Sequence, residues 1–240
     1  MSRLSKKNKC GLPGVCDSGT LLGMRGSIHE VLAAVKNECR QWPIPSVTVL
    51  ARQTCSPFVV LISCIISLRT RDAVTAAASE RLFSCADNPL AISALSVDRL
   101  ADLIYPAGFY RTKATQIKAI CERIVAEFSG RVPDTLDDLL TFPGVGRKTA
   151  NLVVSLGYGK PGICVDVHVH RIVNRWGYVT ARTPDLTEQA LRDRLPLEYW
   201  IPLNDLLVSF GQHRCLPVTP RCSDCSVRSY CDQRGVTRIR

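Results

Sequence analysis

A glycine turn that leads into a predicted helix carries the residues of this chain best suited to chemistry. Residues 143–148 have the sequence Pro-Gly-Val-Gly-Arg-Lys, which ends at Lys148, and Asp166 follows farther along the chain. Glycines let the backbone turn tightly and approach another molecule closely. The free N–H groups and the positive dipole end of a helix N-terminus suit a phosphate group. Lys148 is an amine that can attack an electrophilic carbon, and Asp166 can assist it. We therefore interpret the segment as a phosphate-binding element with a built-in nucleophile.

A second set of reactive side chains lies near the C-terminus. Four cysteines form the pattern C-x6-C-x2-C-x5-C: Cys215, Cys222, Cys225 and Cys231. Zinc binds four thiolates tetrahedrally and a [4Fe–4S] cluster also takes four, one per iron, so the spacing alone favours neither. The segment is polar and rich in proline, which argues against ordinary core cysteines. A metal centre is therefore predicted here.

The remaining cysteines show no such pattern. The chain has twelve in total, many for an intracellular protein, where thiols stay reduced. Cys64 and Cys121 lie on apolar helical faces and are interpreted as small buried hydrophobes. Cys10 and Cys16 are only two potential ligands, so no site is assigned to them.

The elements that must position these groups are all predicted to be helices. Ser27 is expected to cap the first, with Glu30 as its capping-box partner, and residues 42–45 end it. Asp72 is a candidate cap for a helix over 73–83. No run shows the period-two alternation of a sheet, so the fold class is all-α. From Pro57 onward, helical spacing of apolar residues predicts helices over 57–68, 71–86, 89–94, 97–104, 111–128, 135–141, 147–157, 165–176, 185–194 and 199–210.

Composition narrows the class of partner. The 240 residues carry a formal net charge of +10, which favours a polyanion such as nucleic acid. No apolar run approaches the roughly 20 residues of a membrane span; the richest, 58–68, stops at Arg69. Residues 1–26 are basic and Gly-rich and are predicted to be a disordered arm without a signal-peptide core. We expect a cytoplasmic, nucleoid-associated protein with no membrane partner.

Three features that occur in this order resemble the endonuclease III family of DNA glycosylases, within the helix-hairpin-helix glycosylase superfamily. They are the hairpin 140–150, the segment Val-Asp-Val-His over 165–168, and the four-cysteine loop. The resemblance covers roughly residues 27–232. It implies a two-lobed fold, with a six-helix barrel over 50–160 and a second lobe that joins 27–49 to 161–240. It also implies a [4Fe–4S] cluster on the four cysteines, and a monomer that binds damaged double-stranded DNA between the lobes.

The resemblance assigns Lys148 as the nucleophile and Asp166 as its carboxylate. It implies a bifunctional glycosylase and AP lyase that removes oxidised pyrimidines in base excision repair. The damaged base is flipped out of the stack, and Asp166 stabilises the positive charge that develops on the sugar. Lys148 must be neutral to attack C1′, and the helix N-terminus and Arg147 both disfavour its charged form. The resulting Schiff base acidifies the C2′ proton, and β-elimination breaks the strand.

Further residues match DNA contacts of the family. Gly144, Gly146 and Arg147 would anchor the strand. His168 and His170 are interpreted first as structural histidines, although the resemblance places His168 facing the pocket. Phe109 is either a wedge that enters the duplex or an ordinary core aromatic. Two positions depart from the family pattern and leave the lesion preference open. Arg69 stands where the family often has Gln, and Val167 replaces its usual Thr.

Other interpretations remain. Arg111, Lys113 and Lys118 would contact phosphates or simply form a solvated helical face. A monofunctional relative, such as an adenine glycosylase acting opposite oxidised guanine, usually lacks a lysine in this hairpin. A non-catalytic, cluster-bearing DNA-binding protein would not need Lys148 paired with Asp166.

Overall fold

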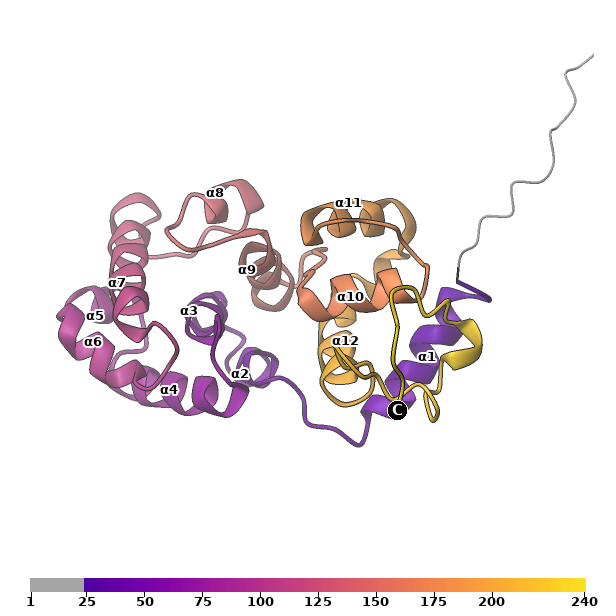
Figure 1. Ribbon diagram of the computed structural model, residues 1–240. Helices are drawn as coiled ribbons and strands as arrows, with labels where there is room; N and C mark the ends of the chain where they lie inside the picture. The colour runs from indigo at the N-terminus through magenta and orange to yellow at the C-terminus, as the bar shows by residue number, and fades with distance from the viewer. Residues whose placement is uncertain (1–23) are drawn as a thin grey trace, which may run out of the picture.

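The computed structural model describes residues 24–240, and over that range the chain forms helices and loops but no strand (Figure 1). The predicted all-α class is confirmed. Most of the predicted basic arm lies outside the described residues. At its end, the Met24 and Arg25 amides already donate to the carbonyls of Gly177 and Tyr230. None of the helices in the described range is long and apolar enough to cross a membrane.

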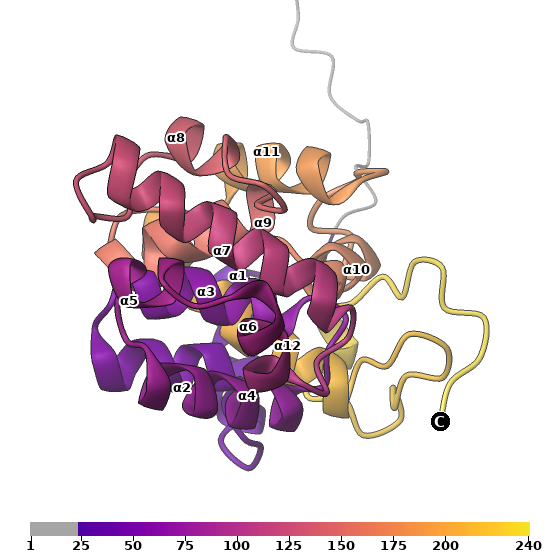
Figure 2. The same ribbon diagram turned by 90° about the vertical axis from the view of Figure 1, so that its left-hand side faces the viewer.

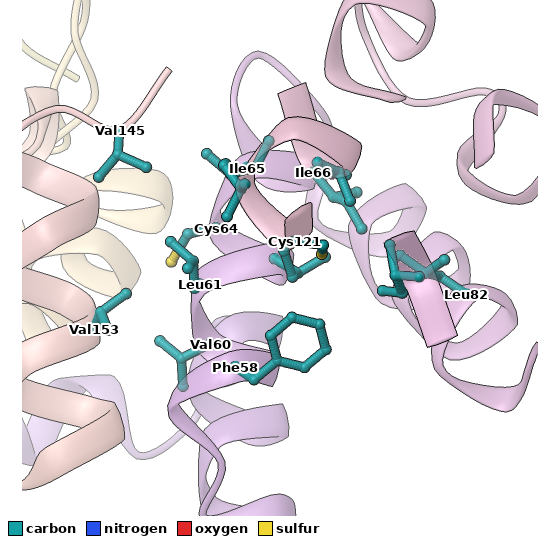
Figure 3. Close-up of a cluster of buried hydrophobic side chains, with 14 of the residues drawn as sticks. Phe58, Val60, Leu61, Cys64, Ile65, Ile66, Leu82, Cys121, Val145 and Val153 are labelled. Carbon is teal, nitrogen blue, oxygen red and sulfur yellow. The ribbon is translucent and has the colours of Figure 1, made fainter. Parts of the chain in front are cut away.

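The first lobe is built around one apolar helix, α3 (Pro57–Ser67), in which residues 58–66 are all buried. Figure 3 shows Cys64 and Ile65 of α3 packed among residues of neighbouring elements, including Val153. Because α3 is apolar on every side, it must be enclosed by other helices. Around it lie α2 (Ser46–Thr54), α4 (Asp72–Cys85), α5 (Pro89–Ser93), α6 (Val97–Ile104), α7 (Tyr110–Glu127), α8 (Leu136–Leu140), α9 (Arg147–Leu152) and the π-helical turn η1 (Val153–Gly157).

The second lobe combines the start of the described chain with its end. It contains α1 (Ile28–Cys39), α10 (Val167–Arg175), α11 (Pro184–Arg194) and α12 (Pro202–His213), around a separate core that includes Trp176 and Phe210. Two short 3-10 turns, η2 (Leu197–Tyr199) and η3 (Arg228–Tyr230), complete it. After α12 the chain runs as an irregular loop outside the helices (Figure 2). The two lobes meet where α9 faces α10 (Figure 1).

Local signals placed most helix ends correctly. Ser27 and Glu30 form the expected capping box at the start of α1. The interpretation of Asp72 was wrong: Arg71 is the N-cap residue of α4, and Asp72 is already helical. Its carboxylate instead accepts hydrogen bonds from the backbone N–H of Ser46, at 3.1 Å, and from the Ser46 hydroxyl, at 2.7 Å. Asp72 therefore caps α2, a helix that the local sequence pattern did not predict.

Candidate active site

Lys148 lies in the first turn of α9, which begins immediately after the glycine turn. Gly144 has a φ of +75°, and a Cβ there would lie 2.8 Å from the Gln116 side chain, so the turn needs glycine. Gly146 is the N-cap residue, and a Cβ on it would meet only open space. The turn therefore leaves the N-terminus of α9 approachable from outside, with Lys148 half-exposed beside it.

Asp166 has two functions in this geometry, one for each carboxylate oxygen. Its Oδ1 accepts hydrogen bonds from the backbone N–H groups of His168, at 2.8 Å, and Val169, at 2.9 Å, which caps α10. Its Oδ2 lies 3.9 Å from Nζ of Lys148. The Asp166 side chain is only 7% exposed, whereas that of Lys148 is 45% exposed. The fold therefore fixes the carboxylate firmly and leaves the amine accessible, which suits a group that stabilises positive charge and a nucleophile respectively.

A cavity of about 400 Å³ opens beside this pair, between the two lobes. Ligand sites commonly have this size. Lys148 and Thr149 come from one lobe, and Asp166, His168 and Asn204 from the other. A ligand in the cavity would therefore touch both lobes.

Arg69 and Phe109 lie together at the exposed rim of the first lobe. The guanidinium carbon of Arg69 lies 5.5 Å from the centroid of the Phe109 ring, a cation–π contact. Phe109 is 64% exposed, so it is not a core aromatic. Arg69 also lines the cavity. Both residues have a positive φ, 51° and 57°, which side chains other than glycine rarely adopt.

Arg147 has a partner within the protein. Its Nε and Nη2 donate to the two oxygens of the buried Glu188 on α11, at 2.9 and 2.8 Å. Arg192 donates to the same carboxylate at 2.9 Å. Because Glu188 balances the charge of Arg147, the expected repulsion between Arg147 and Lys148 is reduced. Arg147 instead connects the helix of Lys148 to the second lobe.

His168 and His170 have different surroundings. His168 lines the cavity, and its Nδ1 lies 3.1 Å from Nη2 of Arg171. Burial lowers the pKa of His168, and the charges of Arg171 and Lys148 act in the same direction against the opposing effect of Asp166. Its imidazole is therefore neutral at pH 7. His170 bonds to the Thr187 hydroxyl at 2.7 Å and has a structural role.

Two lysines of α7 are not part of a phosphate-binding face. Lys113 is 4% exposed, and Lys118 donates to the carbonyls of Ser93 and Leu95, at 2.5 and 3.1 Å, and pairs with Glu122. Sequence reasoning missed the burial of Lys113, and it missed Glu188 altogether. Both are charged residues on amphipathic helices, where the local pattern predicts exposure.

The four cysteines of the C-terminal loop line one pocket against Trp176 and Phe210 of the second lobe: Cys215, Cys222, Cys225 and Cys231. Across residues 24–240, no three His, Cys, Asp or Glu side chains are arranged to hold a single metal ion. A [4Fe–4S] cluster binds each thiolate through a different iron, so its ligands need not converge on one atom. Two sulfurs receive hydrogen bonds, from Arg175 Nη1 to Cys215 at 3.4 Å and from the Gln233 amide to Cys231 at 3.3 Å. The donor set therefore fits such a cluster.

Comparisons with known proteins identify the family of this chain. Residues 62–197 match the family described as HhH-GPD superfamily base excision DNA repair protein. The chain is 46% identical to Endonuclease III of Thermotoga maritima, over 77% of this chain and 88% of that protein. It is 40% identical to Endonuclease III-like protein 1 of Bos taurus, over 72% of this chain but only 58% of the bovine protein.

Two solved structures bound to DNA have the same fold. A non-covalent Endonuclease III–DNA complex aligns with a TM-score of 0.77 and 30% identity, over 86% of this chain and 94% of that one. A trapped Endonuclease III–DNA covalent intermediate aligns with a TM-score of 0.70 and 34% identity, over 74% of this chain and 84% of that one.

Proposed function

The chain belongs to the endonuclease III family of the HhH-GPD superfamily, and from this premise we propose that it is a bifunctional DNA glycosylase and AP lyase that removes oxidised pyrimidines in base excision repair. The observation that carries the proposal is the Lys148–Asp166 pair, 3.9 Å apart beside a cavity between the lobes. A monofunctional glycosylase does not require an amine at this position.

Duplex DNA is proposed to bind across the junction of the lobes, as a trapped covalent Endonuclease III–DNA complex exists for a similar protein. Arg69 and Phe109 would enter the base stack at the rim, while Gly144 and Gly146 contact a phosphate through the turn before α9. The damaged nucleotide would occupy the cavity, because its glycosidic bond cannot be reached inside the duplex. His168, neutral and in the cavity wall, would contact the extruded nucleotide. Arg147 would support the strand-anchoring turn through its bond to Glu188.

The chemistry divides between the two side chains. The Asp166 carboxylate stabilises the positive charge that develops on the sugar as the base departs. As the glycosidic bond breaks, the base leaves with the bonding electron pair, the neutral amine of Lys148 bonds to C1′, and the proton that this amine gives up is taken by the departing base. The C1′–O4′ bond then breaks, the ring oxygen takes up a proton, and the opened sugar is held as a Schiff base between Nζ and C1′, which makes the C2′ proton acidic. Loss of that proton expels the 3′ phosphate and breaks the strand.

The four-cysteine loop is proposed to hold a [4Fe–4S] cluster on Cys215, Cys222, Cys225 and Cys231. When bound, the group would crosslink a loop that has little regular secondary structure. The Arg175 guanidinium, which is buried, donates to Cys215 and to the carbonyls of Leu216 and Pro217, both at 2.6 Å. This chain thus fixes the first ligand from the side of α10.

We also propose that the protein acts as a monomer on chromosomal DNA, in the nucleoid. One chain supplies both Lys148 and Asp166, so that no partner subunit is needed to complete the pair. The two hydrophobic cores support the division into a barrel lobe and a cluster lobe.

Product analysis on a defined duplex tests this function. A thymine-glycol duplex should lose its base and be cut 3′ to the lesion, giving the unsaturated aldehyde end of β-elimination. An intact strand with an abasic site after gentle work-up would show a monofunctional glycosylase. Tight binding without base release or cleavage on a panel of defined lesions would show a non-catalytic DNA-binding protein.

A further inference from the structure

Two exposed loops of the first lobe adopt backbone conformations that must be held in place. Arg69 follows α3 and Phe109 precedes α7, and each has a left-handed backbone. Such conformations persist in residues other than glycine only when the surrounding structure enforces them. The two loops lie against each other: a Cβ on Gly108 would come within 2.4 Å of the Arg69 carbonyl oxygen.

The buried ammonium of Lys113 holds the first of these loops. Its Nζ donates to the carbonyls of Ile66, at 2.7 Å, and Leu68, at 2.5 Å. Ile66 lies in the last turn of α3 and Leu68 is the C-cap residue, at a helix end where carbonyls lack helical partners and the dipole favours a cation. Its third bond goes to the Thr70 hydroxyl at 2.9 Å. Lys113 therefore spans both sides of Arg69.

The Thr70 hydroxyl connects Lys113 to the second loop by hydrogen bonds. Its hydroxyl oxygen also accepts a hydrogen bond from the Gly108 amide at 3.1 Å, and its hydroxyl donates to the Leu68 carbonyl at 3.2 Å. The residue after Gly108 is Phe109, whose ring lies under the Arg69 guanidinium. One chain of hydrogen bonds thus runs from Lys113 through Thr70 to the loop of Phe109.

Lys113 supplies its hydrogen bonds at the cost of burying a charge. No carboxylate in the part of the chain that the structure describes lies within ion-pair distance of its Nζ. Burial lowers the pKa of Lys113 to about 8, which is a sign that the charge is unfavourable there. An unbranched apolar side chain such as Met would fill the same space without burying a charge, but it would remove the donor to the Ile66 and Leu68 carbonyls. What only the ammonium supplies is three directed hydrogen bonds to the loops.

We propose that Lys113 is a positioning residue that latches the loops of Arg69 and Phe109 into one preformed unit, so that both side chains enter the duplex together. The inference rests on the proposed function and deepens it. Lys113 would act when the duplex is unstacked, by holding the two loops in position, and would take no part in the chemistry at C1′. Without the latch, each loop would have to be ordered on the DNA, and flipping would become slower.

A matched pair of variants tests the latch. Lys113→Met removes the three bonds but keeps the volume, and Lys118→Met is the control, because Lys118 also donates to carbonyls from α7 but far from both loops. The first readout is the fluorescence rise of 2-aminopurine beside the lesion when the enzyme binds, which requires no chemistry. The second compares single-turnover base release from duplex DNA with Schiff-base trapping on a single-stranded abasic oligonucleotide, which needs no flipping.

Lys113→Met should lose most of the fluorescence rise and release the base from duplex about 10-fold more slowly, as expected for the loss of a hydrogen bond to a charged donor. Trapping on the single strand should stay within about twofold of wild type, a difference too small to represent a lost interaction. Lys113→Arg, which keeps a charged donor, should recover part of the signal, and Lys118→Met should match wild type.

Two results would overturn the proposal. One is a normal fluorescence rise and duplex rate in Lys113→Met, whatever its melting temperature. The other is an equal loss on both substrates in Lys113→Met and Lys113→Arg, since a latch cannot act where no base is flipped. Failure of the proposed function looks different: wild type itself would then neither release a base nor be trapped, while the fluorescence readout would still report on the latch.

Discussion

The two lobes place the same residue type in opposite environments. In the first lobe, Cys64 and Cys121 are buried in the apolar core, as Figure 3 shows, and burial raises the pKa of each thiol to about 12. They pack as small hydrophobes, as predicted from their positions on apolar helical faces. In the second lobe, four half-exposed cysteines line one pocket on an irregular loop.

The loops and helices of the two lobes are also held differently. The first lobe is ordered by apolar burial around α3. The C-terminal loop is ordered by polar contacts to its backbone, from Arg175, and by Glu38 of α1, which pairs with Arg214 and accepts from the Ser226 hydroxyl at 2.5 Å. An apolar side chain in the core of the first lobe can therefore be exchanged at the cost of some packing, whereas the C-terminal loop depends on its polar contacts.

Replacing a cysteine in each lobe should give the largest contrast. Cys225→Ser removes a proposed cluster ligand, so the visible absorbance and the bound iron should be lost and the C-terminal loop should become sensitive to protease. Cys121→Ser should keep the visible absorbance and the bound iron. Its free energy of unfolding should fall by about 1–3 kcal/mol, the penalty of a buried hydroxyl without a partner. Absorption spectra, iron analysis and limited proteolysis measure this. Equal loss of iron in both variants would contradict the assignment of Cys225 as a cluster ligand and of Cys121 as a core residue.

Asp166→Asn should separate chemistry from capping at the junction of the lobes. Asparagine caps a helix about as well as aspartate, so the free energy of unfolding should change by less than about 1 kcal/mol. Without the negative charge beside the sugar, duplex incision should fall by about 10²–10³-fold. Single-turnover incision and urea unfolding of the same preparation test both parts.

Asp166→Ala provides the matched comparison. This variant should lose incision activity to the same extent. Its free energy of unfolding should also fall by about 1 kcal/mol, because alanine cannot cap α10. Near wild-type incision by Asp166→Asn would mean that the carboxylate only caps α10.

Glu188→Gln should have a smaller effect than the two preceding changes: it should lower the free energy of unfolding by weakening the contact between the lobes. Losing the partner of a buried ion pair typically destabilises by ~3–5 kcal/mol, but Arg147 is 37% exposed, so we expect about 2 kcal/mol. Burial alone would raise the pKa of Glu188, yet hydrogen bonds from Arg147 and Arg192 lower it below its usual value of 4.5.

The sign of the pH dependence follows from that lowered pKa. The stability that ionised Glu188 contributes is complete above pH 4.5 and is lost as the pH falls through the pKa in the folded state. The difference in unfolding free energy between wild type and Glu188→Gln should therefore shrink in acid. A difference that is constant from pH 7 to pH 3 would show that the charge of Glu188 is not what joins the lobes.

Periodicity and short motifs were sufficient for features that depend on neighbours in sequence. They predicted the all-α class, the capping box at Ser27 and the Pro-Gly-Val-Gly turn before Lys148. They failed where the partner is distant in sequence. Helix α2 was missed because its cap is Asp72, and the roles of Lys113 and Glu188 depend on burial by other helices. The fold, not the local pattern, decides which charged residues are solvated.

Lys148 is proposed to form the covalent bond to C1′, and locating that bond tests this role most directly. The enzyme is incubated with an abasic duplex in borohydride, which reduces the Schiff base, and the adduct is digested and sequenced by mass spectrometry. We predict that the deoxyribose remnant is attached to Nζ of Lys148, and that Lys148→Gln forms no adduct. A remnant on another amine, or a full-strength adduct in Lys148→Gln, would contradict the account.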